Sequence, residues 1–543
     1  MTRLATLLGT AVALALPHGA LAHGTTERPN LLLIVADDLG YADTGPFGGE
    51  IATPNLDALA GEGVLFTNFH ANASCAVTRA MLLTGIDNHL AGVGQQGNLP
   101  ANQPIRAGYE AVLSDRVATV AELLSDAGYR TSIAGKWHQG SDWDSQPQNR
   151  GFDKAAVLLE GGGAHFKQDE MGILKNSPFT FMHDGRIVEV PDDYYSSTYF
   201  TDQLIEAIGD GQEEAPFFAF GAFTAPHWPI QAPKVDIDAY AGRYDAGWEV
   251  LATERIRRQK ELGLLRADFP EQPEFERARA WDSLSAEEKR TASRHMEAYA
   301  GMVTAFDREI GRLVDHLKAI GEYDTTAIVF MSDNGAEGGV RGEPDWVAAN
   351  FNQSYDNIGQ ANSFVEYGPG WAQAGTVPNR LYKYLPYEGG NHVPAIIHYP
   401  AAFPARHTDA LASVIDVTPT LLDLAGVEHP GIRFDRRDIL PMEGASMAGF
   451  LRGDTRVLNP EGHVVAFESA GFASLRRGDW KIVFEPKEHQ DWQLYDMTAM
   501  TPEKTDVAAA HPEVTEDMRR AFVLWAGAHN VPVTERGLPR GLQ

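Results

Sequence analysis

Four short apolar runs, each followed by polar or ionisable side chains, constrain the fold of this chain more than any other feature. They span residues 30–35, 130–134, 216–223 and 327–331. An unbroken apolar run of this length is typical of a strand that is buried on both faces, as in a parallel sheet. Helical patterns alternate with the runs, over residues 117–127 and 298–317. The alternation predicts an α/β fold, with a large, mostly parallel sheet between layers of helices.

The length of 543 residues exceeds what one ordinary core supports, so we expect two domains. Proline, glycine and charged residues gather near residue 430 and predict a boundary there, between domains over residues 23–430 and 431–543. Within the first domain, a charged stretch between about residues 235 and 294 predicts a helical excursion. In the second, four short runs predict a small antiparallel sheet, and residues 514–528 a closing helix, giving an α+β unit.

The N-terminal segment is typical of a signal peptide over residues 1–22. Arg3 precedes an uncharged stretch over residues 4–16, and Ala22 ends a small-residue cleavage pattern. This stretch is too short to span a bilayer, and no later run approaches the roughly 20 apolar residues that a spanning helix requires. We therefore expect a periplasmic or secreted protein without a membrane anchor, the alternative being a buried N-terminal helix.

The net charge and the single cysteine limit which partners the protein can bind and which chemistry it can use. Acidic residues outnumber basic ones by 74 to 45, a formal charge of −29, so the overall field should repel nucleic acid. The one cysteine, Cys75, cannot form a disulfide within the chain. It is an inert core residue, a reactive thiol or a modified residue, and the first is the commonest case for a lone cysteine.

Polar side chains follow all four predicted strands, where functional groups collect in open α/β sheets. These side chains are Asp37 and Asp38, Lys136 and His138, His227, and Asp333 and Asn334. Three carboxylates and an amide carbonyl are hard oxygen ligands, which favour Ca²⁺ or Mg²⁺ over zinc. Calcium fits better, because so many protein oxygens leave little room for the waters that magnesium keeps. Taken singly, each acidic pair could instead be a solvated turn or a helix start.

The segment over residues 74–85, Ser-Cys-Ala-Val-Thr-Arg-Ala-Met-Leu-Leu-Thr-Gly, resembles the sulfatase signature. The matching residues are Cys75, Thr78, Arg79, Leu82, Thr84 and Gly85. Val-Ala-Asp-Asp-Leu-Gly-Tyr, Thr-Pro-Asn-Leu-Asp-Ala-Leu-Ala, Ala-Gly-Lys-Trp-His, Ala-Pro-His-Trp-Pro and Ser-Asp-Asn-Gly-Ala match further family motifs. Over nearly its whole mature length, the chain is similar to bacterial arylsulfatases of the alkaline phosphatase superfamily. The resemblance implies an alkaline phosphatase-like mixed sheet and the hydrolysis of small sulfate monoesters, aryl esters above all.

The resemblance also implies how the nucleophile is made and held. In the family, a formylglycine-generating enzyme oxidises the cysteine, here Cys75, to formylglycine (3-oxoalanine), whose hydrate attacks sulfur. One calcium ion would be bound by Asp37, Asp38, Cys75, Asp333 and Asn334.

Further roles follow from the same resemblance. Arg79 and Lys136 would hold the nucleophile, and Lys136 and Lys383 the sulfate. His138 would be the base that expels sulfate, and His227 the acid that protonates the departing alcohol. Taken alone, such lysines are usually solvated and such histidines usually structural.

Three positions depart from the family pattern. Val77 stands where the family has proline or alanine, and the maturing enzyme reads this position. Because a β-branched residue lacks proline's fixed φ, it predicts poorer docking of the peptide in that enzyme. Gln139 and His392 also differ from the family, but neither removes a ligand.

Two other functions stay open on the sequence. One is a phosphate or phosphonate ester hydrolase of the same superfamily, since the same cations hold either tetrahedral oxyanion. The other is an unmatured protein that binds sulfate esters without turnover. Trp228 and the helical excursion are candidates for shaping a leaving-group pocket.

Overall fold

The computed structural model describes residues 28–97 and 106–541. The predicted signal peptide over residues 1–22 lies outside the described residues. Within the described part, no helix combines the length and apolar character needed to cross a bilayer.

The centre of the fold is a ten-stranded mixed sheet in the order β11-β2-β10-β9-β1-β8-β4-β5-β6-β7. Its four central strands are parallel to one another and correspond to the four predicted runs. They are β9 (Thr326–Ser332), β1 (Asn30–Ala36), β8 (Phe217–Ala222) and β4 (Arg130–Lys136). The fold class predicted from the sequence is confirmed, and the carboxyl ends of these strands meet at one edge.

The outer strands are shorter, and the sequence did not predict most of them. They are β10 (Ala395–His398), β2 (Val64–Phe66), β11 (Arg406–Thr408), β5 (Lys154–Leu158), β6 (Phe181–His183) and β7 (Arg186–Ile187). The sequence also predicts a strand over residues 393–398, and β10 corresponds to it. It pairs antiparallel with both β9 and β2, which makes the sheet mixed.

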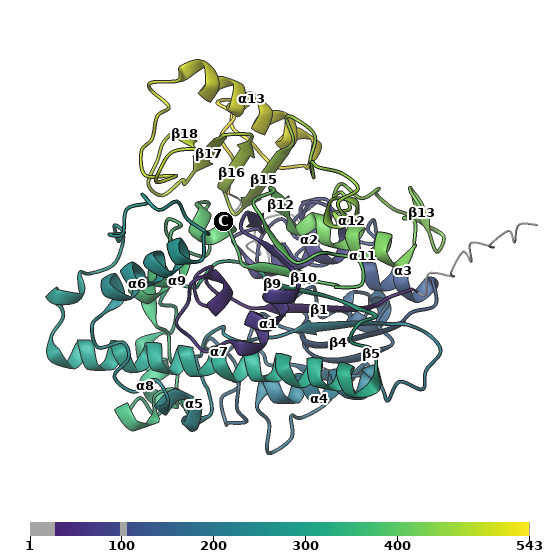
Figure 1. The fold of residues 1–543 in the computed structure, drawn as a ribbon, viewed down its shortest axis with the longest axis horizontal. Helices are drawn as coiled ribbons and strands as arrows, with labels where there is room; N and C mark the ends of the chain where they lie inside the picture. The colour runs from purple at the N-terminus through teal and green to yellow at the C-terminus, as the bar shows by residue number, and fades with distance from the viewer. Residues whose placement is uncertain (1–27, 98–105, 542–543) are drawn as a thin grey trace, which may run out of the picture.

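Helices cover both faces of the sheet, as the alternating pattern predicts (Figure 1). Side chains of β1 point alternately into two cores: Leu32 and Ile34 into one, Leu33 and Val35 into the other. The first core includes residues of α1 (Pro54–Glu62), α4 (Ser196–Ile208) and α7 (Ala286–Ile320). The second includes α2 (Cys75–Thr84), α3 (Val120–Asp126) and α11 (Val417–Ala425). Burial on both sides explains why the central strands are apolar throughout.

The charged stretch over residues 235–294 forms no strand, as predicted, but helices make up only part of it and turns and loops the rest. It contains most of α5 (Lys234–Asp238), all of α6 (Trp248–Glu261) and the first turns of α7. The latter helix begins at Ala286, earlier than the apolar spacing indicated, because Ser285 and Glu288 form a capping box at its start.

The C-terminal part forms the predicted antiparallel sheet, at the top of Figure 1. Its strands are β15 (Val464–Ser469), β16 (Phe472–Arg477), β17 (Trp480–Phe484) and β18 (Gln493–Asp496), and α13 (Pro512–Ala528) packs against them. The remaining elements are β3 (Phe69–His70), α8 (Pro344–Asn350), α9 (Gly368–Thr376), α10 (Glu388–Asn391), β12 (Ala412–Ser413), β13 (Arg433–Phe434), β14 (Arg437–Asp438) and α12 (Ala448–Arg452). The domain boundary at residue 430 stays a prediction.

Candidate active site

Cys75 is the first residue of α2, a helix that is not among the predicted elements. Ser74 precedes it in an extended conformation, and all ten residues of α2 are buried. A helix that is apolar and buried all round shows no amphipathic pattern, which explains why the sequence did not indicate it. The Sγ atom of Cys75 lies 3.8 Å from Oδ1 of Asp38, at the carboxyl end of β1.

Three cationic side chains meet three carboxylates around this cysteine. Nζ of Lys136 donates to Oδ2 of Asp37 at 2.7 Å, and Nζ of Lys383 donates to Oδ1 of Asp38 at 2.6 Å. Nε of Arg79 donates to Oδ2 of Asp333 at 2.9 Å. All six side chains are at most 2% exposed. Such buried charges require pairing, and the structure pairs each of them.

Three buried oxygens of the predicted metal ligands nevertheless have no hydrogen-bond partner within residues 28–97 and 106–541. They are Oδ1 of Asp37, Oδ2 of Asp38 and Oδ1 of Asn334. Ligand atoms of Asp37, Asp38, Cys75 and His227 also lie within 4.8 Å of one another. Buried oxygens without donors are costly, and a hard cation would satisfy them. This cluster therefore fits the predicted calcium ion.

Asp333 is more fully engaged than the other predicted ligands. Its Oδ2 accepts from Arg79, and its Oδ1 accepts from the backbone N–H of Asp38 at 3.3 Å. Burial and the neighbouring charge of Asp37 raise the pKa of Asp333 to about 6. Asn334 donates Nδ2 to Oδ1 of Asp38 at 2.7 Å, and its own side-chain oxygen has no partner in the described residues.

Charge and burial also set the protonation of Asp38 and Cys75. Burial alone would raise the pKa of Asp38, but Lys383, His227 and Lys136 outweigh it and hold the pKa below its usual range. Burial raises the pKa of the Cys75 thiol well above its usual range, against the attraction of Lys136 and Lys383. An unmodified Cys75 is thus an uncharged thiol at neutral pH, and an uncharged thiol is a poor nucleophile.

The two predicted histidines lie at the ends of neighbouring strands. His227 follows β8, and its Nδ1 is 2.5 Å from the carbonyl oxygen of Trp228, so Nδ1 carries a proton. Its Nε2 faces the cluster, 3.6 Å from Oδ2 of Asp38. Burial and the nearby lysines lower the pKa of His227 to about 3. His138 follows β4 and is half-buried, and burial together with Lys136 and Arg79 lowers its pKa as well.

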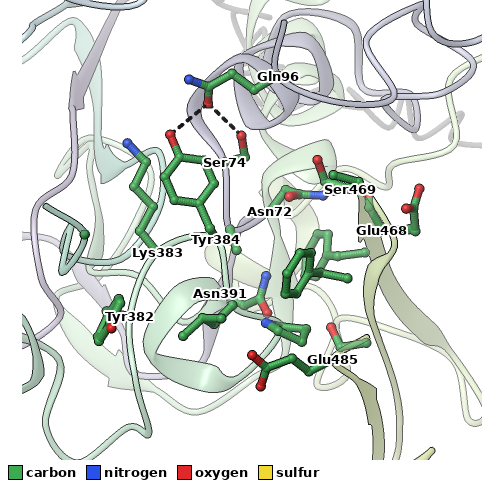
Figure 2. Close-up of a pocket in the computed structure, with 18 of the residues that line it drawn as sticks. Asn72, Ser74, Gln96, Tyr382, Lys383, Tyr384, Asn391, Glu468, Ser469 and Glu485 are labelled. Atoms are coloured by element: carbon green, nitrogen blue, oxygen red, sulfur yellow. Dashed lines mark hydrogen bonds between the residues drawn. The ribbon is translucent and has the colours of Figure 1, made fainter. Parts of the chain in front are cut away.

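A pocket of about 470 Å³ opens beside Lys383 (Figure 2). Its polar lining includes Asn72, Ser74, Gln96, Asn391, Ser469 and Glu485, and its aromatic lining includes Tyr382, Tyr384, Phe467 and Phe472. In Figure 2, Oε1 of Gln96 accepts hydrogen bonds from Ser74 Oγ at 2.9 Å and from the Tyr384 hydroxyl at 3.4 Å. A lining of polar and aromatic side chains could bind the alcohol or phenol part of an ester.

The structure places the two candidates for shaping a leaving-group pocket at different positions. Arg277, from the helical excursion, lines this pocket. Trp228 does not belong to its described lining. It borders a small neighbouring cavity together with Asp38 and Glu337. The stacking of Trp228 on His227, with ring centroids 5.0 Å apart, gives it a packing role instead.

Sequence reasoning missed two groups of residues near the site. Glu337 lies three residues after Asn334, and its Oε2 is 3.7 Å from Nζ of Lys383. Its closeness in sequence to a predicted ligand was the available signal. The second group belongs to β15 and β16 and lines the pocket. No local pattern marks it, since the docking of the C-terminal sheet is a long-range event.

The three departures from the family pattern lie around the cluster without entering it. Val77 is fully buried in the first turn of α2. Gln139 donates Nε2 to the carbonyl oxygen of Ala76 at 2.8 Å and so braces the same turn. His392 has its ring nitrogens 2.9 Å from the Thr67 carbonyl oxygen and 3.2 Å from Oδ1 of Asn379.

Known sulfatases resemble this chain in sequence and in fold. The Sulfatase family model matches residues 29–427. The chain is 41% identical over 521 residues to an uncharacterized sulfatase of Schizosaccharomyces pombe, covering 92% of the chain and 94% of that protein. It is 39% identical over 450 residues to an arylsulfatase of Klebsiella aerogenes, covering 81% and 96%. The solved structure of Ps i-CgsB in complex with k-i-k-neocarrahexaose superposes with a TM-score of 0.66 at 26% identity, covering 92% and 93%.

Proposed function

The chain belongs to the sulfatase family and is a sulfuric ester hydrolase, and we propose that it cleaves sulfate monoesters to an alcohol or phenol and sulfate. One observation carries this proposal. Cys75 lies buried close to Lys136, Lys383 and Arg79, beside carboxylate oxygens that have no partner in the described residues. Its neighbour Ser74 lines the pocket together with Lys383. A cation held by these carboxylates would leave the site with a net positive charge, which would attract a sulfate group.

We propose that Cys75 is converted to formylglycine. The hydrate of this residue would supply an oxygen nucleophile and a second hydroxyl whose deprotonation restores the aldehyde and releases sulfate. The raised pKa of the thiol supports the need for such a conversion. The position of Cys75 at the start of α2 places the modified side chain next to Asp38.

The proposed metal is one calcium ion. The free oxygens of Asp37, Asp38 and Asn334 would hold it, together with Asp333 and the modified residue 75. Bound calcium would supply positive charge to the sulfate oxygens and lower the pKa of the attacking hydroxyl.

The protein's own side chains would carry the remaining steps. Arg79 and Lys136 lie against the carboxylates that surround residue 75, and they would orient the nucleophile. Lys383 stands between Asp38 and the pocket, where it would hold sulfate and face the leaving oxygen. An anionic ester beside His227 would raise the pKa of this histidine, so that its Nε2 could protonate the leaving alcohol. His138 would serve as the base that drives sulfate off.

The pocket lining supports a substrate with a compact polar or aromatic leaving group. We propose a small aryl sulfate, following the similarity to the Klebsiella aerogenes arylsulfatase. A sulfated carbohydrate is the second candidate, favoured by the polar side chains of the pocket and by the oligosaccharide bound in the Ps i-CgsB structure. We also propose that the N-terminal segment directs export.

A direct comparison of esters tests the reaction. Protein made in a host that forms formylglycine would be assayed with 4-nitrophenyl sulfate and 4-nitrophenyl phosphate, with Cys75→Ala as the control. We expect kcat/KM for the sulfate to be higher by about 100-fold or more, equivalent to roughly 2.7 kcal/mol. A higher value for the phosphate would favour the phosphate or phosphonate hydrolase. Binding of either ester without turnover would favour a non-catalytic binding protein.

A further inference from the structure

The segment over residues 380–391 carries Lys383 into the active site and lies between that site and the C-terminal sheet. On the active-site side, the backbone N–H of Lys383 donates to the carbonyl oxygen of Ala336 at 3.0 Å. The N–H of Tyr384 donates to the carbonyl oxygen of Ala73 at 2.8 Å, two residues before Cys75. These bonds connect the segment to the loop after β9, which carries Asp333 and Asn334, and to the residues just before α2, which begins at Cys75.

On its other side, the same segment is tied to the C-terminal sheet by a buried ion network. Nζ of Lys481, on β17, is 2.6 Å from Oε1 of Glu388 and 2.7 Å from Oε1 of Glu503. Oε2 of Glu503 accepts the backbone N–H of Glu388 at 2.7 Å. The side chains of all three residues are at most 6% exposed. Lys481 thus joins two carboxylates and the start of α10, and Arg476 of β16 lies farther from Glu388, at 3.9 Å from its Oε2.

Apolar contacts and one hydroxyl reinforce this attachment. Leu381, Leu385 and Tyr387 form one buried cluster with Val483 and Tyr495 of the C-terminal sheet. The Tyr387 hydroxyl lies 3.1 Å from Oε2 of Glu485, within donating distance. The segment therefore contacts the sheet along much of its length.

The backbone of the segment needs such support. Leu381 and Tyr384 both have positive φ values, 62° and 66°. Non-glycine residues rarely adopt this conformation, and it persists where the surroundings over-determine it. Lys383 lies between the two. Because its side chain is long and flexible, the place of its ammonium group depends on where this backbone is held.

We propose that Lys481 is a positioning residue for catalysis: acting through Glu388, it holds the segment over residues 380–391 so that Lys383 faces the leaving oxygen. The inference rests on the role proposed above for Lys383. A buried ion pair contributes little net stability over apolar packing, but it fixes one arrangement among competing ones. The C-terminal sheet is then part of the catalytic apparatus through a residue that touches no substrate.

The dependence of rate on the leaving group tests this proposal. A misplaced Lys383 harms esters of weakly acidic phenols most, because their departing oxygen needs the most stabilisation. For Lys481→Met, we expect kcat/KM for phenyl sulfate to fall about tenfold more than kcat/KM for 4-nitrophenyl sulfate. Lys481→Arg keeps the charge, so the ratio of kcat/KM for the two esters should return close to its wild-type value. Equal losses for both esters would mean a smaller folded fraction only, and would overturn the proposal.

Three further variants complete the design. Glu388→Gln preserves side-chain size and leaves Lys481 paired with Glu503. It tests the link between Glu388 and Lys481 if Lys481→Met folds poorly, and it should shift the ratio of kcat/KM for the two esters in the same direction. His529→Gln is the matched control, since His529 bonds to Glu443 at 2.8 Å, elsewhere in the C-terminal part. It should leave the ratio unchanged.

Lys383→Ala separates the two possible failures. If this variant leaves the ratio of the two esters unchanged, the role proposed for Lys383 is wrong. If Lys383→Ala shifts the ratio and the folded Lys481→Met and Glu388→Gln variants do not, the positioning role of Lys481 alone is wrong.

Discussion

Nζ of Lys383 lies 2.6 Å from Oδ1 of Asp38, although 345 positions separate the two residues in the sequence. Asp38 follows the end of β1 by two residues and has a positive φ of 69°. The lysine is thus already held at the wall of the pocket before an ester binds. A cation placed in advance stabilises developing negative charge without reorganisation when the ester reacts.

Removal of Lys383 should therefore reduce catalysis strongly. We expect Lys383→Ala to lower kcat/KM for an aryl sulfate by about 10²–10³-fold, the usual effect of deleting one preorganised charge donor. Steady-state release of 4-nitrophenol measures the change. Lys154→Ala is the control, because the Lys154 side chain is 66% exposed and pairs only with Asp184 in the described structure. A loss below threefold would contradict the assigned role.

Removal of the metal should abolish activity and lower stability. The unpaired oxygens of Asp37, Asp38 and Asn334 explain why a cation would stabilise the folded state. We expect EGTA to inactivate the enzyme, added Ca²⁺ to restore it more effectively than Mg²⁺, and Ca²⁺ to raise the Tm. Asp37→Asn should remove most of the rise in Tm, whereas Asp345→Asn, at an exposed position, should not. Full activity in EGTA with an unchanged Tm would exclude the calcium site.

The maturation of Cys75 should depend on Val77. Modified protein would show a peptide mass about 18 Da below that of the thiol, as expected when CHO replaces CH₂SH. Val77 is the third residue of α2, where a backbone N–H has no acceptor within the helix, so proline can replace it. We expect Val77→Pro to raise the modified fraction measured by mass spectrometry, with Val77→Ala intermediate. Equal fractions in all three proteins would show that this position does not limit maturation.

The stability of the protein should depend on pH through His89. Its ring nitrogens lie 2.9 Å from Asp87 and 2.6 Å from Glu468, a residue of β15. Burial alone would lower the pKa of His89, but the two carboxylates outweigh burial and raise it to about 9. Protonated His89 therefore stabilises the folded state fully below pH 6.5, and this contribution is lost as the pH rises through about 9.

Urea unfolding of the wild type and His89→Gln at several pH values measures this contribution. The difference in free energy of unfolding should be on the order of 3 kcal/mol at pH 6 and should shrink toward pH 10. His463→Gln is a suitable control, since burial lowers the pKa of His463 instead. A difference that stays constant from pH 6 to pH 10 would show that His89 is not charged in the folded protein.

The sequence by itself determined the central strands, the antiparallel C-terminal sheet and the candidate residues at the strand ends. These features depend on local apolar patterning and on motifs of a few residues, and both are readable along the chain. Asp37 and Asp333 could be assigned to one edge because parallel strands of a buried sheet bring their carboxyl ends together.

Only the tertiary structure decided the helix at Cys75, most of the outer strands, and the attachment of Lys383 to the C-terminal sheet through Glu388 and Lys481. The ten residues of α2 are buried on every side, so no amphipathic period marks them. The pairing of Lys481 with Glu388 joins residues 93 positions apart and depends on how two sheets dock. The local sequence pattern indicates which side chains become buried. The partner of a buried charge is set by long-range packing instead, because any group of opposite charge that the fold brings near can offset the cost of burial.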